Sequence, residues 1–287
     1  MLKRIQQKWL AIKLITRMDK PIGTYLLLWP TYWALWIASD GWPNLQLLLV
    51  FSLGVFIMRS AGCVINDYAD RKIDGEVERT KNRPLVNGMM TSGEAINLFG
   101  VLIGMAFGLV LMLSWSTIYL SVVAVLLAAI YPFMKRHTQL PQLFLGAAFS
   151  WGMIMAFSEA QGEIPLVAWL LFTANLCWTI AYDTMYAMVD RDDDVKIGVK
   201  STAILFAEND KRVIGFLQLM TLALLWTVGD ILAFGWPYQL CIIAAAGLFS
   251  YQQLLIVNRE RDACFQAFLH NHWVGLVVFV GIAIEYL

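Results

Sequence analysis

Two aspartate-rich segments contain the residues of this sequence that are best suited to chemistry. The first, residues 66–74, reads Asn-Asp-Tyr-Ala-Asp-Arg-Lys-Ile-Asp, and the second, residues 183–194, ends in Asp-Arg-Asp-Asp-Asp. Each segment directly follows a long apolar run. Carboxylates held close together in such a place cost free energy unless cations neutralise them. Two such clusters in one protein therefore indicate a site for a divalent metal ion and a diphosphate.

The spacing within each segment places its carboxylates on one face of a helix, because residues four and seven positions apart share a face. The first face carries Asn66, Asp70 and Asp74, with Asp67 on nearly the same side. The second face carries Asp183, Asp190 and Asp194, together with Tyr186. Asp192 and Asp193 point elsewhere and are expected to be solvated. Because Mg²⁺ typically combines a few carboxylates with phosphate oxygens and water, the two faces predict Mg²⁺ ions that bridge to a diphosphate.

Basic and aromatic side chains surround the two segments. The loops supply cations suited to the remaining phosphate oxygens, namely Arg71, Lys72, Arg79, Lys81, Arg83, Lys135, Arg136, Lys196 and Lys200. Tyr186 lies within the second segment and Tyr131 near the end of another apolar run. An aromatic face at either position could stabilise a cation or simply pack.

Arg59 is the only Lys or Arg within an apparent membrane span, and it precedes Asn66 by seven residues. Charges inside the membrane are rare and usually mark function. Arg59 could pair with the aspartates of its own helix, or its planar guanidinium could bind a substrate carboxylate. The sequence leaves both possibilities open.

The composition indicates a polytopic membrane protein. Of 287 residues, 59% are hydrophobic and 15% are charged, which is too apolar for a typical soluble domain. The net charge is zero, so nothing suggests nucleic-acid binding. The four cysteines and three histidines form no disulfide or zinc pattern, which leaves carboxylates as the metal ligands. The N-terminal residues show no removable signal peptide.

Nine apolar segments have about the length that a bilayer requires. They cover residues 22–39, 44–65, 95–114, 117–133, 140–158, 165–188, 213–232, 236–254 and 273–286. A soluble bundle with a buried core is the alternative interpretation, but the distribution of charge argues against it.

Charge asymmetry predicts the orientation. All 21 Lys and Arg residues, except Arg59, lie in the N-terminal tail or in alternate loops. The opposite side carries only the acids Asp40, Glu159, Glu163, Asp230 and Glu285. The positive-inside rule then places the N-terminus and both aspartate segments in the cytoplasm and the C-terminus outside.

Residues 1–19 have the pattern of an amphipathic helix on the cytoplasmic membrane surface. Its apolar residues Leu2, Ile5, Trp9 and Ile12 recur at a spacing of three to four. An ordinary basic flank fits this stretch equally well.

The two aspartate segments resemble the signatures of the UbiA-type membrane prenyltransferases. The matching patterns are Asn66-Asp67-x2-Asp70-x3-Asp74 and Tyr182-Asp183-x2-Tyr186-Ala187-x2-Asp190-x3-Asp194. Residues 17–23, 79–84, 131–136 and 190–198 further resemble the branch of this family that prenylates 4-hydroxybenzoate for ubiquinone. The resemblance runs from about residue 15 to the end of the sequence, with no departure at the aspartate positions.

The resemblance implies an all-α membrane domain over residues 1–287, with nine transmembrane helices around a central cavity. This cavity would open to the cytoplasmic face and sideways to lipid. Mg²⁺ would be held through the diphosphate by Asp67, Asp70, Asp74, Asp190 and Asp194. Lys135 and Arg136 would contact the diphosphate or organise the loop above it, and Arg17, Arg59 and Asn66 would hold the aromatic acid.

The implied reaction transfers a polyprenyl group from polyprenyl diphosphate to the ring carbon ortho to the hydroxyl of 4-hydroxybenzoate. Asp183 or the released diphosphate would remove the ring proton. The protein would lie in the bacterial inner membrane, and its partners would be these two substrates and the lipid bilayer.

Three alternatives remain. Membrane CDP-alcohol phosphotransferases also use Asp and Mg²⁺, but their DGxxAR…GxxxDxxxD pattern is absent from this sequence. A cation transporter would favour carboxylates near the bilayer midplane. Within the family, the acceptor could instead be a naphthoate, homogentisate or haem.

Overall fold

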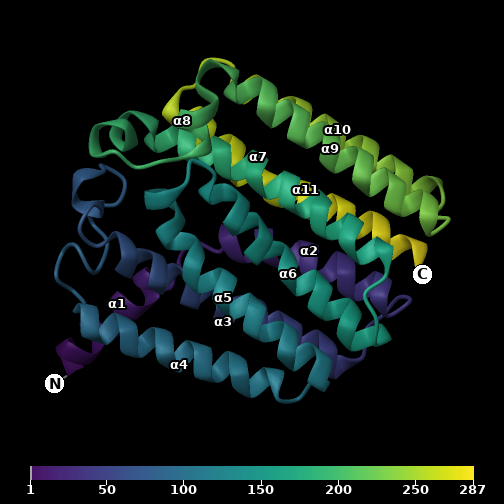
Figure 1. The fold of residues 1–287 in the computed structure, drawn as a ribbon, viewed down its shortest axis with the longest axis horizontal. Helices are drawn as coiled ribbons and strands as arrows, with labels where there is room; N and C mark the ends of the chain where they lie inside the picture. The colour runs from purple at the N-terminus through teal and green to yellow at the C-terminus, as the bar shows by residue number, and fades with distance from the viewer. Residues whose placement is uncertain (1) are drawn as a thin grey trace.

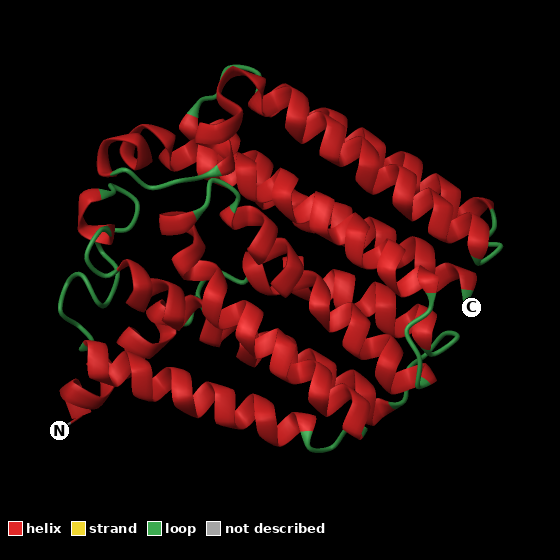
Figure 2. Cartoon of the chain, viewed as in Figure 1, coloured by secondary structure: helices red, strands yellow, loops and turns green. Residues whose placement is uncertain are grey.

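The computed structural model describes the backbone of residues 2–287 and the side chains of residues 6–287, and this part of the chain is all helix and loop (Figures 1 and 2). The elements are α1 (Leu2–Ile15), α2 (Ile22–Ala38), α3 (Leu45–Asp70), η1 (Asp74–Glu76), α4 (Ser92–Val110), α5 (Trp115–His137), α6 (Pro141–Gln161), α7 (Leu166–Ile197), α8 (Thr202–Phe206), η2 (Ala207–Asn209), α9 (Asp210–Ile231), α10 (Trp236–Leu255) and α11 (Arg261–Glu285). The prediction of an all-α fold is confirmed.

Seven candidate membrane spans are long and apolar enough to cross a bilayer. They are α3, α4, α5, α6, α7, α9 counted together with α8, and α11. The other two predicted segments also form helices, α2 of 17 residues and α10 of 20 residues. That these two cross the membrane as well remains a prediction.

The helices that carry the aspartates end differently from the prediction. The helix α7 continues to Ile197, so its aspartates stay on one continuous helix. The helix α3 instead ends at Asp70, and Asp74 begins the short helix η1. The prediction that Asn66, Asp70 and Asp74 share one helix is therefore wrong for Asp74, whose position depends on the loop.

The two ends of the bundle differ in their connections (Figure 1). Short turns link α2 to α3, α4 to α5, α6 to α7 and α9 to α10 at the end where the C-terminus lies. The opposite end holds α1, α8 and the long connection of residues 71–91 between α3 and α4. Both aspartate segments lie at this second end.

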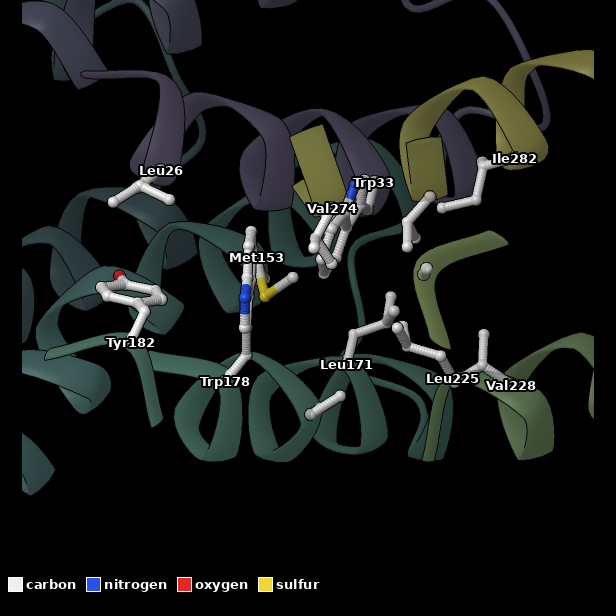
Figure 3. Packing of buried hydrophobic residues seen from close by; sticks show 14 of the residues in the cluster. Leu26, Trp33, Met153, Leu171, Trp178, Tyr182, Leu225, Val228, Val274 and Ile282 are labelled. Atoms are coloured by element: carbon white, nitrogen blue, oxygen red, sulfur yellow. The ribbon is translucent and has the colours of Figure 1, made fainter. Parts of the chain in front are cut away.

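The core is centred on tryptophans of α2 and α7. The rings of Trp33 and Trp178 stack with centroids 5.4 Å apart, and Figure 3 shows Trp178 of α7 directed toward Trp33 of α2 and Val274 of α11. Trp33 Nε1 donates to the carbonyl of Gly275, at 2.9 Å. A Cβ on Gly275 would lie 2.7 Å from Cδ1 of Trp29 and 2.9 Å from the ring of Trp178. A glycine is therefore needed here, as at other close contacts between membrane helices.

The helix α1 packs against α3 and α4 through Ala11 and Ile15, which are buried beside Val64. Trp9 remains 61% exposed, so it is available to a membrane surface. The side chains of Leu2 and Ile5, which the amphipathic prediction also used, lie outside the described residues. Contact of α1 with lipid stays a prediction.

Candidate functional site

A polar cavity of about 230 Å³ lies between the two aspartate segments. We call it the polar cavity. From the first segment it is lined by Asn66, Asp70 and Asp74, and from α7 by Asp183, Tyr186, Asp190 and Asp194. Its basic and aromatic lining residues include Arg79, Arg83, Tyr131, Lys135 and Lys200. The structure thus brings together residues far apart in sequence, as the two predicted faces required.

The first segment reaches this cavity through a folded loop. Asp74 is fixed because its carbonyl accepts a 2.7 Å hydrogen bond from Thr80 Oγ1. Arg83 Nη1 bridges two carboxylates, at 2.7 Å from Asp74 Oδ2 and 3.1 Å from Asp67 Oδ1. Burial lowers the pKa of Arg83, but these two carboxylates raise it more, so that the net change is upward and the guanidinium stays charged.

Asp67 has a different environment from the other aspartates. Its side chain is 1% exposed, and both of its oxygens accept from Arg17 Nη2, at 2.8 and 3.0 Å. It does not line the polar cavity. Asp67 therefore holds Arg17 and Arg83 in this structure, whereas Asp70 and Asp74 face the space between the segments.

The second segment is held by a basic residue of the 71–91 loop. Arg79 Nε lies 3.1 and 3.0 Å from the two carboxylate oxygens of Asp190, and its guanidinium lies 4.6 Å from the centre of the Tyr186 ring. Lys135 forms an ion pair with Asp70. Asp70 and Asp190, one from each segment, are thus each paired with a cation supplied from another element, as buried carboxylates require.

These residues fit Mg²⁺ bound together with a diphosphate better than Mg²⁺ alone. Among the described residues, no group of three or more His, Cys, Asp or Glu side chains is gathered closely enough to hold a metal. Asp70 Oδ1 is nevertheless buried without a hydrogen-bond partner, although buried polar atoms normally have one. Oxygen donors from both segments would become available if the basic side chains paired with phosphate oxygens instead.

A second, larger cavity of about 1080 Å³ adjoins the first, and we call it the apolar cavity. Its walls are mainly apolar residues of α3, α4, α5 and α6, among them Phe51, Phe107, Val125 and Phe149. The two cavities share Asn66, Arg79, Arg83, Tyr131, Leu145, Asp183, Tyr186 and Asp190. A molecule with a charged head and an apolar tail could therefore occupy both.

Arg59 lines the apolar cavity together with Arg17 and Asn66. Its Nη1 donates to the carbonyl of Thr16, at 2.8 Å, and its Nη2 to that of Lys20, at 3.3 Å. Within the described part of the chain it has no carboxylate partner, whereas Arg17 is paired with Asp67. The possibility that Arg59 pairs with the aspartates of its own helix is thus not realised.

Arg136 lies apart from the other predicted substrate-binding residues. It lines neither cavity, and its guanidinium donates to the carbonyl of Ala69. It thus contacts the end of α3, and its expected role at the diphosphate or in the loop above it stays a prediction. Arg79 and Arg83 could not be singled out from the other loop cations by sequence alone. Their signal was present in the run Arg79-Thr-Lys-Asn-Arg-Pro84, but their partners depend on how the loop folds.

Comparison with known proteins gives a consistent result. Residues 27–275 match the UbiA prenyltransferase family. The chain is 59% identical over 282 residues to a 4-hydroxybenzoate octaprenyltransferase of Klebsiella pneumoniae subsp. pneumoniae, covering 98% of both chains. It is 61% identical over 272 residues to a protein of the same name from Pseudoalteromonas translucida, covering 95% of this chain and 93% of that one.

Solved structures have the same fold. A UbiA homologue from Aeropyrum pernix K1 superposes with a TM-score of 0.81 at 24% identity, covering 92% of this chain and 98% of that one. A UbiA homologue from Archaeoglobus fulgidus, bound to GPP and Mg²⁺, gives 0.67 at 16% identity, covering 95% of this chain and 99% of that one. Together with the sequence matches over nearly the whole chain, this shows that the protein belongs to the UbiA prenyltransferase family.

Proposed function

We propose that this protein transfers a polyprenyl group from polyprenyl diphosphate to 4-hydroxybenzoate, giving 3-polyprenyl-4-hydroxybenzoate for ubiquinone biosynthesis. The observation that carries the proposal is the union of the polar and apolar cavities, which share residues of both aspartate segments. A diphosphate fits the polar part and an isoprenoid tail the apolar part. The names of the relatives from Klebsiella and Pseudoalteromonas support a prenyl group and this acceptor.

The aspartates would hold Mg²⁺ together with the diphosphate. Asp70, Asp74, Asp190 and Asp194 line the polar cavity and supply carboxylate oxygens from both sides. When bound, Mg²⁺ would neutralise charge on the departing diphosphate. Asp67 is the least accessible of the predicted ligands, because its carboxylate already forms ion pairs with Arg17 and Arg83.

Basic side chains would take part by exchanging partners. Lys135 and Arg79 now neutralise Asp70 and Asp190, and both line the polar cavity. If Asp70 and Asp190 held Mg²⁺, the ammonium of Lys135 and the guanidinium of Arg79 would be free to donate to phosphate oxygens. Cations aimed at the place where negative charge develops lower the barrier to bond cleavage.

The aromatic acid would bind on the apolar side, with its carboxylate on Arg59. Arg59 and Arg17 line this cavity with Asn66, and only Arg59 of the two arginines lacks a carboxylate partner among the described residues. The acid's ring would then lie near the first isoprene unit. Tyr131 and Tyr186 line both cavities at this junction, where their ring faces can stabilise an allylic cation.

Asp183 is our candidate for the base that removes the ring proton. It lines both cavities and therefore lies where the acceptor ring and the diphosphate meet. The surrounding apolar walls exclude water, which would otherwise capture the allylic cation. The released diphosphate is the other candidate base.

We further infer that residues 1–287 form one membrane domain in the bacterial inner membrane. Nine helices, α2–α7 and α9–α11, would cross the bilayer, with the N-terminus and the aspartate segments in the cytoplasm. The lysines and arginines gathered at that end support this orientation.

A prenyl-transfer assay in isolated membranes tests the proposed function. Membranes that contain the protein would receive a polyprenyl diphosphate and labelled 4-hydroxybenzoate, with Mg²⁺ or with EDTA. We expect a 3-polyprenyl product with Mg²⁺ and none with EDTA. If no product forms from 4-hydroxybenzoate but one forms from a naphthoate or homogentisate, the proposed acceptor is wrong and the proposed reaction type stands. Failure with every acceptor, combined with Mg²⁺ uptake, would favour a transporter.

A further inference from the structure

Gly23 occupies a helical position that does not favour glycine. It is the second residue of α2, and its backbone does not adopt the left-handed conformation that would require a glycine. Glycine is among the poorest helix formers, and alanine is the best. Local structure therefore gives no reason for a glycine here, and the reason must lie in what the residue contacts.

The contact is the guanidinium group of Arg59. A Cβ added to Gly23 would lie 2.8 Å from Arg59 Nε, 2.9 Å from Nη2 and 3.3 Å from Cζ. These are the three nearest atoms outside the helix backbone, and all three belong to Arg59. The bare backbone of Gly23 and the carbonyls of Thr16 and Lys20 thus form one seat for this guanidinium. We call these three groups the Arg59 seat.

We infer that Gly23 is a positioning residue that sets the place of Arg59 for recognition of the carboxylate of the acceptor, an inference that rests on the proposed role of Arg59. A guanidinium carries five N–H donors, and the two carbonyls of the seat leave others for an anionic ligand. Because the seat fixes the plane of the guanidinium, it also fixes the direction in which a carboxylate can bind in the apolar cavity.

A methyl group at Gly23 would displace Arg59 rather than the backbone. The atoms that it would meet are at the far end of a flexible side chain, so the fold can absorb the change. The displaced guanidinium would lose its alignment with Thr16 and Lys20. The cost should therefore appear in binding of the aromatic acid and not in folding.

The test compares Gly23→Ala with Gly100→Ala in the full-length protein. Gly100 is an exposed residue of α4, and a Cβ there would meet nothing within 4 Å. We expect Gly23→Ala to raise KM for 4-hydroxybenzoate about tenfold or more, as loss of one hydrogen bond to a charged group would. KM for the prenyl diphosphate and the thermal midpoint in detergent should stay near those of Gly100→Ala.

Two further measurements test whether Gly23→Ala acts on KM for 4-hydroxybenzoate through Arg59. In an Arg59→Ala background, Gly23→Ala should change nothing further, because the displaced group is gone. With methyl 4-hydroxybenzoate, which has no carboxylate, both single variants should resemble the wild type. Additive effects, or equal changes in both KM values, would overturn the inference.

The outcomes separate this inference from the proposed function. If Arg59→Ala leaves KM for 4-hydroxybenzoate unchanged, the proposed role of Arg59 fails, and the role of Gly23 fails with it. If Arg59→Ala raises that KM and Gly23→Ala does not, only the role of Gly23 fails. If no prenyl product forms from any acceptor with the wild type, the proposed reaction itself fails.

Discussion

At the scale of single residues, three carboxylates of the site already form ion pairs with basic side chains. Asp70 is paired with Lys135, Asp74 with Arg83 and Asp190 with Arg79. A buried carboxylate without such a partner would be costly. In the proposed function, these cations would instead bind the diphosphate, because the carboxylates would hold Mg²⁺.

Lys135→Met should remove one of these dual-purpose cations while keeping a similar length of side chain. We expect kcat to fall about 100-fold, the usual effect of deleting one group that stabilises charge in a transition state. Steady-state assays with both substrates measure this fall. Lys13→Met is the matched control, since Lys13 is an exposed residue of α1 and lines neither cavity. Equal rates for the two variants would exclude Lys135 from the site.

Arg59 should act on one substrate only. We expect Arg59→Ala to raise KM for 4-hydroxybenzoate by about tenfold or more through loss of a charged hydrogen bond, with little change in KM for the prenyl diphosphate. Arg59→Lys should restore part of the affinity, because it keeps the charge but loses the planar pair of donors. Similar changes in both KM values for Arg59→Ala would mean that Arg59 is structural.

At the scale of elements, the C-terminal end of α7 has the polar cavity on one side and an ion-pair network on the other. One side faces the polar cavity through Asp190 and Asp194. On the other side, Arg191 Nη1 lies 3.1 Å from Asp210 Oδ2, and Arg259 Nη2 lies 2.7 Å from Asp210 Oδ1. Asp210 is fully buried at the first turn of α9. It therefore joins α7 and α9 to the loop before α11.

Asp210→Ala should destabilise the protein by about 3 kcal/mol, the lower end of the range for a broken buried ion pair, because water can still reach both arginines. The apparent unfolding temperature in detergent should fall by roughly 6 °C. Lys81→Ala breaks only an exposed pair with Glu78 and should shift it far less. If both variants unfold at the same temperature, Asp210 does not join these elements.

Helix patterns could be predicted from the sequence, whereas loop geometry could not. The apolar periods predicted the helices and the continuous face of Asp183, Asp190 and Asp194 on α7. The end of α3 at Asp70 was missed, because four-residue spacing fits a helix whether or not the chain continues as one. Asp74 still reaches the site because Arg83 and Thr80 hold it there. These contacts between loop residues leave no periodic signal.

At the scale of the whole molecule, the two ends of the bundle have different roles. The aspartate segments, the long 71–91 loop and α1 gather at one end, and short turns close the other (Figure 1). Charge asymmetry predicted this division, since lysines and arginines avoid the end with short turns. The apolar cavity could not be predicted from the residues, because its shape depends on how α3, α4, α5 and α6 pack.

The predicted orientation can be tested with two cysteine variants. Glu163 lies in the turn before α7 and Lys81 in the 71–91 loop, and both are exposed. In intact cells, a membrane-impermeant maleimide should label Glu163→Cys, and it should label Lys81→Cys only after the membrane is opened. The wild type, whose four cysteines lie within helices, gives the background. The reverse labelling pattern would invert the topology.

The central claim is that both aspartate segments bind the same diphosphate together with Mg²⁺. The most direct test measures product formation by Asp70→Asn and Asp190→Asn, with Asp192→Asn as the control. Asp70 and Asp190 line the polar cavity from opposite segments, whereas the side chain of Asp192 is 79% exposed. All three variants remove one charge, and insertion into the membrane is checked for each. We expect the first two to form no 3-polyprenyl product and Asp192→Asn to match the wild type. A near-normal rate in Asp70→Asn or Asp190→Asn would contradict the claim.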